Sequence, residues 1–400
     1  MPIEHYLFVL IAILVGAKLL GELAERIRQP AVLGELLAGV LLGASVLNVV
    51  HHDDAIVHLL AEIGVIVLLF EIGLETDLRR LLQVGAASSL TAIVGVVAPF
   101  GLGYLVATWF GREPLVAIVI GAALTATSVG ITARVLSDLG RLQERESQIV
   151  LGAAVIDDVI GLIILAVVSG MIAGAGVSVG GVTRITLLAF GFLVAVLVVG
   201  RFAVPALFGL LERVGKPDTL AIMGLVLAFF IAWLADRAGS ALIIGAFAAG
   251  LTLAPTRFAH PVEQGVVRLG QFFVPIFFVS VGAAVDVRTF ADPDVLLLGA
   301  ALIAVAVVGK FIAGYAAWWM PVRKHVVGVG MIPRGEVGLI FAQAGLAAGV
   351  ITGGTFSALT LMVLVTTFMA PPLLRILFPP SEADATDADD NALARSVTEA

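Results

Sequence analysis

The chain has 400 residues, of which 60% are hydrophobic and only 13% are charged, and its mean hydropathy is +1.10. A soluble domain carries about 25% charged residues, so this composition excludes a soluble globular protein. The net charge of −7 and the lack of a basic tract argue against a nucleic-acid partner, and the absence of cysteine excludes disulfides.

Apolar runs of about 20 residues, long enough to cross a bilayer as helices, recur along the whole chain. They predict an all-α polytopic membrane protein embedded in the lipid bilayer, since a β-barrel would show alternating polar and apolar residues. The first run lacks a basic leader and a small-residue cleavage site, so we expect a retained helix. The thirteen expected spans are 6–24, 31–49, 57–77, 85–108, 114–136, 147–172, 183–206, 218–236, 240–254, 265–287, 293–318, 326–349 and 355–377.

Residues 379–400 are polar, acidic and free of aromatic side chains. We expect them to form a short disordered tail after a membrane domain of residues 1–378. No soluble domain follows in this sequence, so we expect no appended nucleotide-binding domain.

The loops predict an orientation, because Lys and Arg favour the cytoplasmic side of a membrane. With the N-terminus outside, the inner loops hold fourteen Lys and Arg residues and the outer loops hold four. This asymmetry predicts a protein of the cell (inner) membrane whose N-terminus is outside and whose C-terminus is cytoplasmic.

Three segments of the first half recur in the second half at nearly one offset. The pairs are VLGELLAGVLLG (32–43) with IIGAFAAGLTLA (243–254), LFEIGLETD (69–77) with FVSVGAAVD (278–286), and SVGIT (128–132) with EVGLI (336–340). Matched segments lie seven spans apart, and because seven is odd the copies have opposite orientations. Inverted-topology repeats are typical of secondary transporters, whose site lies where matching helices are interrupted.

Spans 5 and 12 contain residues that interrupt helices in matching positions. Proline and glycine remove or weaken helical hydrogen bonds, and backbone groups freed at this depth must be buried or line a wet cavity. We expect two facing helix breaks, although two ordinary kinked helices would give the same pattern. The polar and helix-breaking residues of these spans are Thr127, Ser128, Gly130, Pro333, Arg334, Gly335 and Glu336.

Asp157 and Asp158 lie about 15 Å into span 6, and Lys310 lies at a similar depth in span 11. A charge at the bilayer centre costs at least about 2.5–3.5 kcal/mol, so such residues face the protein interior and pair. Neighbouring helical residues point about 100° apart, so one aspartate can pair with Lys310 while the other faces a cavity.

A carboxylate in a buried cavity can hold either a proton or a hard cation such as Na⁺. Thr127, Ser128 and freed backbone carbonyls are further oxygen ligands for such an ion. Competition between H⁺ and a cation at one carboxylate is the minimal chemistry of antiport. A Na⁺-coupled symporter and a purely structural buried ion pair are the alternatives.

These residues carry a resemblance to a known family. The segments TATSVGITARVL (125–136), VIDDVIGL (155–162), GK (309–310) and PRGEVGLIFA (333–342) resemble motifs of the cation:proton antiporter-2 family of monovalent cation/proton antiporters. Within that family, the chain is most similar to the NapA type of Na⁺/H⁺ antiporter. The resemblance covers residues 1 to about 377.

The resemblance implies thirteen helices with crossed unwound segments, a homodimer and elevator-like alternating access. It implies a core of about 85–172 and 293–377 and a dimerisation scaffold of about 1–77 and 183–287. It further implies that Asp158 is the main carrier of H⁺ and Na⁺ and that Asp157 pairs with Lys310. The supporting positions it implies are Thr127 at the first break and Arg334 and Glu336 at the second.

The family consists of transporters, so the resemblance implies no enzyme activity, catalytic residues or cofactors. The implied activity is exchange of Na⁺ or Li⁺ for H⁺ in pH homeostasis, with K⁺/H⁺ exchange as the alternative. Two aspartates with Lys310 resemble the electrogenic members, because electroneutral relatives commonly have Asn at the first position. Near span 3, an acidic mouth and a solvated helix end are equally good interpretations of Glu71, Glu75 and Asp77.

Overall fold

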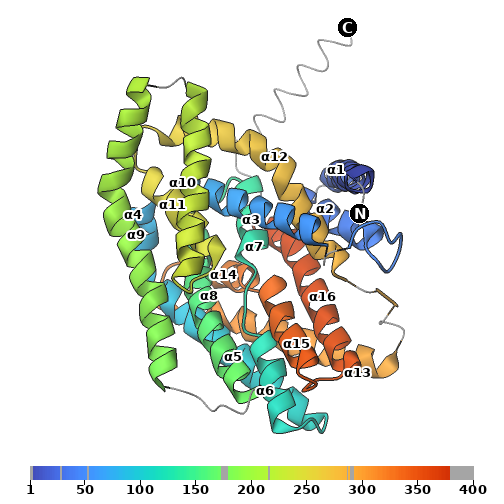
Figure 1. Ribbon diagram of the computed structural model, residues 1–400. Helices are drawn as coiled ribbons and strands as arrows, with labels where there is room; N and C mark the ends of the chain where they lie inside the picture. Colours follow the sequence, from blue (N-terminus) through green and yellow to red (C-terminus); the bar gives the residue numbers. More distant parts are fainter. Residues whose placement is uncertain are drawn as a thin grey trace.

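The computed structural model describes residues 3–27, 29–51, 54–172, 179–214, 217–285, 287–288 and 292–378. These residues fold almost entirely into helices (Figure 1). The helices are α1 (Ile3–Arg26), α2 (Ala31–Leu42), α3 (Ala55–Glu75), α4 (Leu78–Gln83), α5 (Gly85–Trp109), α6 (Pro114–Ala123), α7 (Val129–Asp138), α8 (Arg145–Ile172), α9 (Val179–Val214), α10 (Pro217–Arg237), α11 (Leu242–Leu253), α12 (Ala259–Ala283), α13 (Pro293–Ala313), α14 (Lys324–Gly330), α15 (Glu336–Ala347) and α16 (Gly353–Leu377).

The prediction of an all-α polytopic membrane protein is confirmed. Among the described residues, nine helices are long and apolar enough to cross a membrane, and four shorter apolar helices accompany them. Each predicted span overlaps one helix or one pair of short helices, although the number of membrane crossings stays a prediction. The predicted tail, residues 379–400, lies outside the described residues.

Close backbone contacts reproduce the inverted repeat in three dimensions. A Cβ added to Gly39 would lie 2.2 Å from a backbone oxygen of α12, and one added to Gly282 would lie 2.2 Å from a backbone oxygen of α2. Gly73 and Gly250 bring α3 and α11 together in the same way, at 2.4 Å each. The repeat matches Gly39 with Gly250 and Gly282 with Gly73. The contact of Gly39 with Gly282 in one half is therefore equivalent to the contact of Gly250 with Gly73 in the other.

A second pair of contacts obeys the same relationship. An added Cβ on Gly34 would lie 2.0 Å from the carbonyl oxygen of Leu20, and one on Gly245 would lie 2.7 Å from that of Ile231. α2 therefore packs on α1 as α11 packs on α10. The helix pairs α5 with α8 and α13 with α16 extend the correspondence to the rest of each half.

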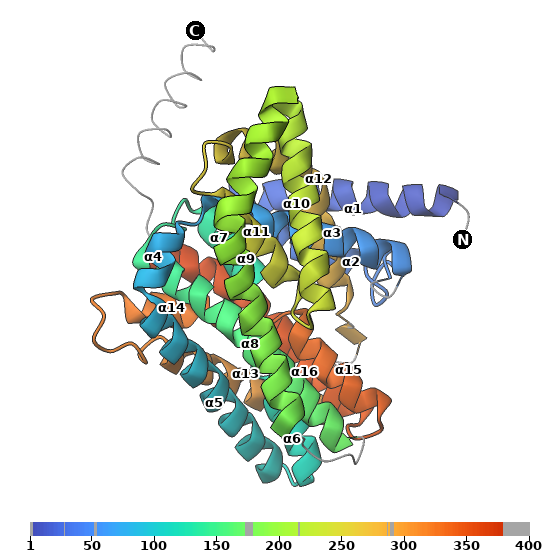
Figure 2. The same cartoon turned by 60° about the vertical axis from the view of Figure 1, so that its left-hand side comes forward.

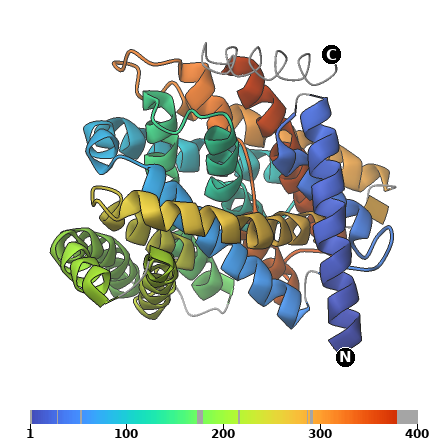
Figure 3. The same ribbon diagram turned by 90° about the horizontal axis from the view of Figure 1, so that it is seen from above.

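The helices form two packed groups. In one, α3 packs along α11 and α12, and α2 packs between α1 and α12; in the other, α5 and α13 pack together with α6, α8 and α16 around them. Seen from above, α12 runs across the molecule between α1 on one side and α9 and α10 on the other (Figure 3). Figure 2 shows α9 and α10 side by side along the outside of the molecule.

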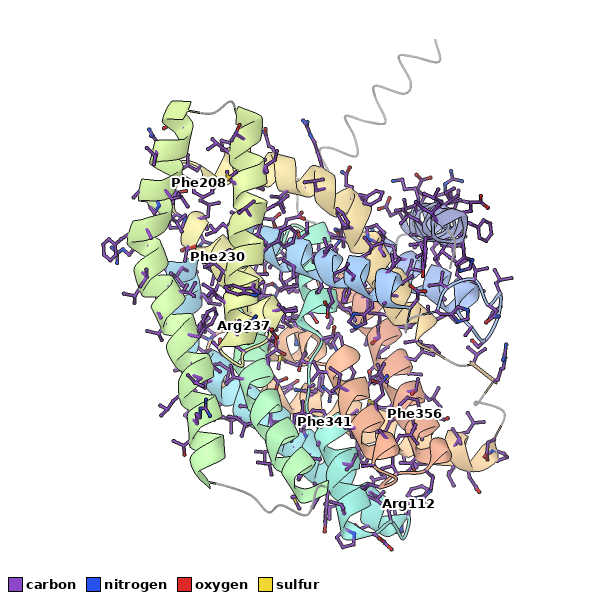
Figure 4. The ribbon with its side chains drawn as sticks, in the orientation of Figure 1. Arg112, Phe208, Phe230, Arg237, Phe341 and Phe356 are labelled. Carbon is purple, nitrogen blue, oxygen red and sulfur yellow. The ribbon has the colours of Figure 1, made fainter. Side chains whose placement is uncertain are left out.

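Apolar side chains close the space around the helix breaks. Phe341 of α15 is fully buried, and Phe356 of α16 packs against the same apolar cluster, in the lower half of the view in Figure 4. Ile120 and Ala123 at the end of α6 belong to this cluster as well. The cluster therefore packs against helices that flank both breaks.

Candidate functional site

The two interrupted helices break at the same place and touch. The amide of Ser128, between α6 and α7, donates a hydrogen bond to the carbonyl of Pro333, between α14 and α15, at 2.8 Å. The hydroxyl of Thr132 donates to the carbonyl of Gly330 at 2.8 Å. Backbone carbonyls at the second break thus accept hydrogen bonds from residues at the first break, because polar groups buried away from water need hydrogen-bond partners within the protein.

Small and restricted residues permit this close crossing. A Cβ added to Gly335 would lie 2.7 Å from Oγ of Ser128, so a larger residue would push the segments apart. Pro333 in the same segment has no backbone donor. Gly130 lies in the first turn of α7, where an added Cβ would meet Phe277 at an ordinary 3.5 Å, so the break itself precedes Gly130.

Asp157 of α8 belongs to a group of four buried charged residues, the polar layer, which also contains Asp158, Lys310 and Arg334. Its Oδ2 accepts a hydrogen bond from Nζ of Lys310 on α13 at 2.8 Å, and another from the hydroxyl of Thr127 in the first break. The side chains of Asp157 and Lys310 have no exposed surface. The structure therefore holds the ion pair that the resemblance implied, and Thr127 ties this pair to the break.

Asp158 points to a different part of the molecule, as adjacent helical positions must. It is 8% exposed and borders a cavity of about 10 Å³, which is close to the space that one water molecule needs. Every other residue lining this cavity is apolar, namely Leu69, Val129, Leu151, Val155, Ile243, Ile244 and Phe247. The cavity lies between α8 and the helices α3, α7 and α11, where the two packed groups meet.

Arg334 brings a second buried cation into the layer. It is fully buried, its Nη1 donates to the carbonyl of Ala126 at 3.0 Å, and its own carbonyl accepts from the hydroxyl of Thr367 on α16. Among the described residues, Nε and Nη2 of Arg334 and Oδ1 of Asp157 have no hydrogen-bond partner. Two aspartates, Lys310 and Arg334 thus give the layer a formal charge of zero when all are ionised.

Sequence reasoning named Arg334 only as a supporting position at the second break and missed Thr367 altogether. Nothing in the sequence distinguishes Thr367 from the other hydroxyl residues of α16, such as Thr360 and Thr366, which donate to carbonyls of their own helix. Glu336 begins α15, and its side chain lies outside the described part of the chain.

The acidic residues at the end of α3 have separate contacts. Asp77 caps α4 by accepting from the amide of Arg79 at 2.8 Å, which gives it a structural role at a helix end. Glu75 accepts a hydrogen bond from the hydroxyl of Ser137 on α7 at 3.1 Å. Asp77 and Glu75 therefore contact different helices, α4 and α7.

Crossed broken helices, inverted repeats and a buried charged layer define a polytopic secondary transporter. The family model described as "Sodium/hydrogen exchanger, transmembrane" matches residues 9–378. The chain belongs to this family, and membership confirms the prediction of a monovalent cation:proton antiporter that is not an enzyme.

Relatives and a solved structure agree with this assignment. The chain is 40% identical to the high-affinity Na⁺/H⁺ antiporter NhaS3 of Synechocystis sp., over 92% of this chain and 89% of that protein. It is 35% identical to the Na⁺/H⁺-K⁺ antiporter GerN of Bacillus cereus, over 94% and 96%. The fold resembles the sodium proton antiporter MjNhaP1 of Methanocaldococcus jannaschii, with a TM-score of 0.69 at 18% identity over 94% of this chain and 96% of that one.

Proposed function

We propose that this chain exchanges Na⁺ or Li⁺ for H⁺ by alternating access, with the two ions competing at Asp158. The observation that carries the proposal is the placement of Asp158 beside a small cavity whose other lining residues are apolar. A single ion or proton is the largest cargo that such a cavity fits. This favours exchange over symport with a larger solute, and the names of the relatives also describe exchange.

Asp157 has a different proposed task from Asp158. Its Oδ2 is already occupied by Lys310 and Thr127, so we assign it to holding α8, α13 and the first break together. Ser128 contributes a hydroxyl next to the break, and its backbone amide is used by Pro333. Lys310 and Arg334 balance the two carboxylates, so a bound Na⁺ adds charge to a layer that is neutral when all four groups are ionised.

Charge balance alone gives release of one H⁺ for one Na⁺ bound, because a layer out of water resists an uncompensated charge. We propose a second H⁺, and hence electrogenic exchange, because two aspartates with Lys310 resemble the electrogenic members of the family. Exchange of about two H⁺ for one Na⁺ moves one net charge, worth about 2.3 kcal/mol per 100 mV of membrane potential. With the inside negative, this potential drives H⁺ inward and Na⁺ outward.

K⁺/H⁺ exchange is the second candidate. The B. cereus relative is described as a Na⁺/H⁺-K⁺ antiporter and aligns over 94% of this chain. The small volume beside Asp158 favours Na⁺ and Li⁺ over the larger K⁺ in this arrangement of the helices.

We further propose that the two packed groups of helices move against each other. The moving core comprises about 85–172 and 293–377, and the scaffold comprises about 1–77 and 183–287, which also forms a homodimer. The cavity at Asp158 supports this division, because α8 and α7 of the core and α3 and α11 of the scaffold line it together. We place the protein in the cell membrane with a cytoplasmic C-terminus, as the loop charges predict.

The test is dissipation of a pH gradient in proteoliposomes by NaCl, LiCl and KCl in turn. We expect Na⁺ and Li⁺ to collapse the gradient, and a clamped membrane potential to change the rate. If only K⁺ acts, the K⁺ candidate replaces Na⁺; if no cation acts in sealed vesicles holding folded protein, exchange by this chain is wrong. A rate independent of potential would contradict electrogenicity alone.

A further inference from the structure

A second polar cavity lies between α7 and the helices α1, α2 and α12. Its volume is about 400 Å³, and it shares no lining residue with the cavity beside Asp158. In Figure 1, α1, α2 and α12 lie together in the upper right of the molecule. The charged residues that line this cavity are Lys18, Glu22, Glu25, Glu35 and Arg134.

Glu35 is the unusual residue of this cavity. It is only 6% exposed, and its Oε2 is buried without a hydrogen-bond partner among the described residues. A buried carboxylate oxygen that receives no donor is costly, so it needs a counter-ion or a proton. Glu35 lines the cavity, so a counter-ion has space to approach it.

The two cations of the cavity already have partners on their own helices. Nζ of Lys18 lies 3.5 Å from a carboxylate oxygen of Glu22, four residues further along α1. Nε of Arg134 lies 3.0 Å from Oδ1 of Asp138, four residues further along α7. The charges of both cations still act on Glu35, but among the described residues neither cation forms a hydrogen bond or an ion pair with it.

Three carboxylates around the cavity have no ion pair within the described ranges. Glu25 and Glu35 line the cavity, and Glu71 of α3 lies next to Gly270, which lines it. Oε2 of Glu71 lies 3.0 Å from where a Cβ would stand on Gly270, a lining residue. The cavity thus has an excess of negative charge next to an unpartnered buried oxygen.

We propose that this cavity binds a hydrated monovalent cation, Na⁺ or K⁺, at Glu35. The described residues contain no group of three or more His, Cys, Asp or Glu side chains that could hold a metal ion, which disfavours a direct divalent site. The volume far exceeds the roughly 30 Å³ of one water molecule, so the ion keeps most of its water. The amide of Gln271 also lines the cavity and offers one more oxygen.

This site goes beyond exchange at Asp158 and does not depend on it. Arg134 and Asp138 belong to α7, which continues directly from the first break, whereas Glu35 and Gln271 belong to α2 and α12. A cation held at Glu35 therefore reduces the repulsion between Glu35 on α2 and the carboxylate of Asp138 on α7. By reducing this repulsion, the cation stabilises the packing of α7 against α2 and α12.

The test uses the purified full chain with Asp158→Asn, so that the proposed exchange site is disabled. Thermal unfolding is measured against increasing NaCl or KCl, with choline chloride keeping the ionic strength constant. We expect a saturable rise in the unfolding temperature. Adding Glu35→Gln should raise the half-saturating concentration at least tenfold, whereas Glu113→Gln, at an exposed position before α6 that does not line the cavity, should leave it unchanged.

Two results would overturn the site: no cation-dependent rise with Asp158→Asn, or the same rise after Glu35→Gln. The first would mean that Glu35 is held protonated, and the second that the ion binds elsewhere. If Glu35→Gln does not fold, Glu71→Gln gives the answer. It removes one unpaired charge without changing Glu35, and it should raise the half-saturating concentration several-fold; an unchanged value would also overturn the site.

Discussion

Nζ of Lys310 lies 2.8 Å from Oδ2 of Asp157, and neither side chain has any exposed surface. Thr127 donates to the same oxygen, so one carboxylate atom joins α8, α13 and the first helix break. Asp158, one residue further along α8, borders the cavity instead. The two adjacent aspartates thus have different surroundings, and we expect different effects when each is changed.

Removal of Lys310 should destabilise the fold more than removal of the whole pair. Breaking one partner of a buried ion pair costs about 3–5 kcal/mol, because the other charge is left buried without compensation. We expect Lys310→Met to lower the thermal unfolding temperature strongly, and Lys310→Met with Asp157→Asn to recover much of the loss. Equal unfolding temperatures for the single and double variants would contradict the pairing.

The helix crossing should not tolerate a methyl group at Gly335. The added Cβ would lie 2.7 Å from Oγ and 2.9 Å from Cβ of Ser128, and overpacking of this kind costs about 1–3 kcal/mol. Gly335→Ala should therefore reduce both thermal stability and ion exchange. Ser128→Gly removes both clashing atoms and should restore part of the stability of Gly335→Ala.

Gly101 provides the matched control for that experiment. It lies in α5, and a Cβ added there would meet nothing within 4 Å. Gly101→Ala should leave stability unchanged or raise it slightly, since alanine favours helix by about 1 kcal/mol over glycine. If Gly101→Ala were as damaging as Gly335→Ala, the crossing would not be the cause.

The inverted repeat predicts matched effects at matched glycines. Gly39 and Gly250 occupy equivalent positions, with added Cβ atoms at 2.2 and 2.4 Å from backbone oxygens of α12 and α3. Backbone cannot move aside as a side chain can, so alanine at either position should lower the unfolding temperature by a similar, large amount. Alanine at Gly209 of α9, with nothing within 4 Å, should have little effect, and a harmless Gly250→Ala would contradict the equivalence.

Arg334 should require its guanidinium group and its positive charge. Its Nη1 bridges to the carbonyl of Ala126 in the opposite break, and its charge balances the buried layer. Arg334→Gln removes the charge and should abolish exchange in proteoliposomes, while Arg334→Lys keeps the charge and should retain part of it. Equal activity of the two variants would show that the charge of Arg334 is dispensable.

Long apolar runs made most of the fold predictable from sequence. Pro333 and Gly335 lie within the second break, whereas Gly130 only follows the first, whose own residues are LTATS (124–128). The short helix α4 was missed, since six residues with two arginines show no apolar run. α9 extends to Val214, past the predicted end at 206, and the apolar run in fact continues there as LFGLL (207–211).

The candidate site was predictable in its residue types but not in its geometry. Isolated charges in apolar runs identify Asp157, Asp158 and Lys310, because such charges are rarely placed without a purpose. The residues alone do not report which way a side chain points, and only the family resemblance assigned the pairing with Lys310 to Asp157 and the carrier role to Asp158. It also gave no sign that Arg334, beside a helix break, would be as fully buried as Lys310.

The central claim is that H⁺ and Na⁺ compete at Asp158, and Na⁺-induced proton release tests it most directly. Na⁺ is added to purified protein in a weakly buffered detergent solution, and the pH change is recorded for the unaltered chain, for Asp158→Asn and for Asp236→Asn at an exposed position of α10. The account predicts release from the unaltered chain and from Asp236→Asn, and an apparent Na⁺ affinity that weakens as the pH falls, because protons displace Na⁺ from the carboxylate. Asp158→Asn should release no protons; release equal to that of the unaltered chain would contradict the claim.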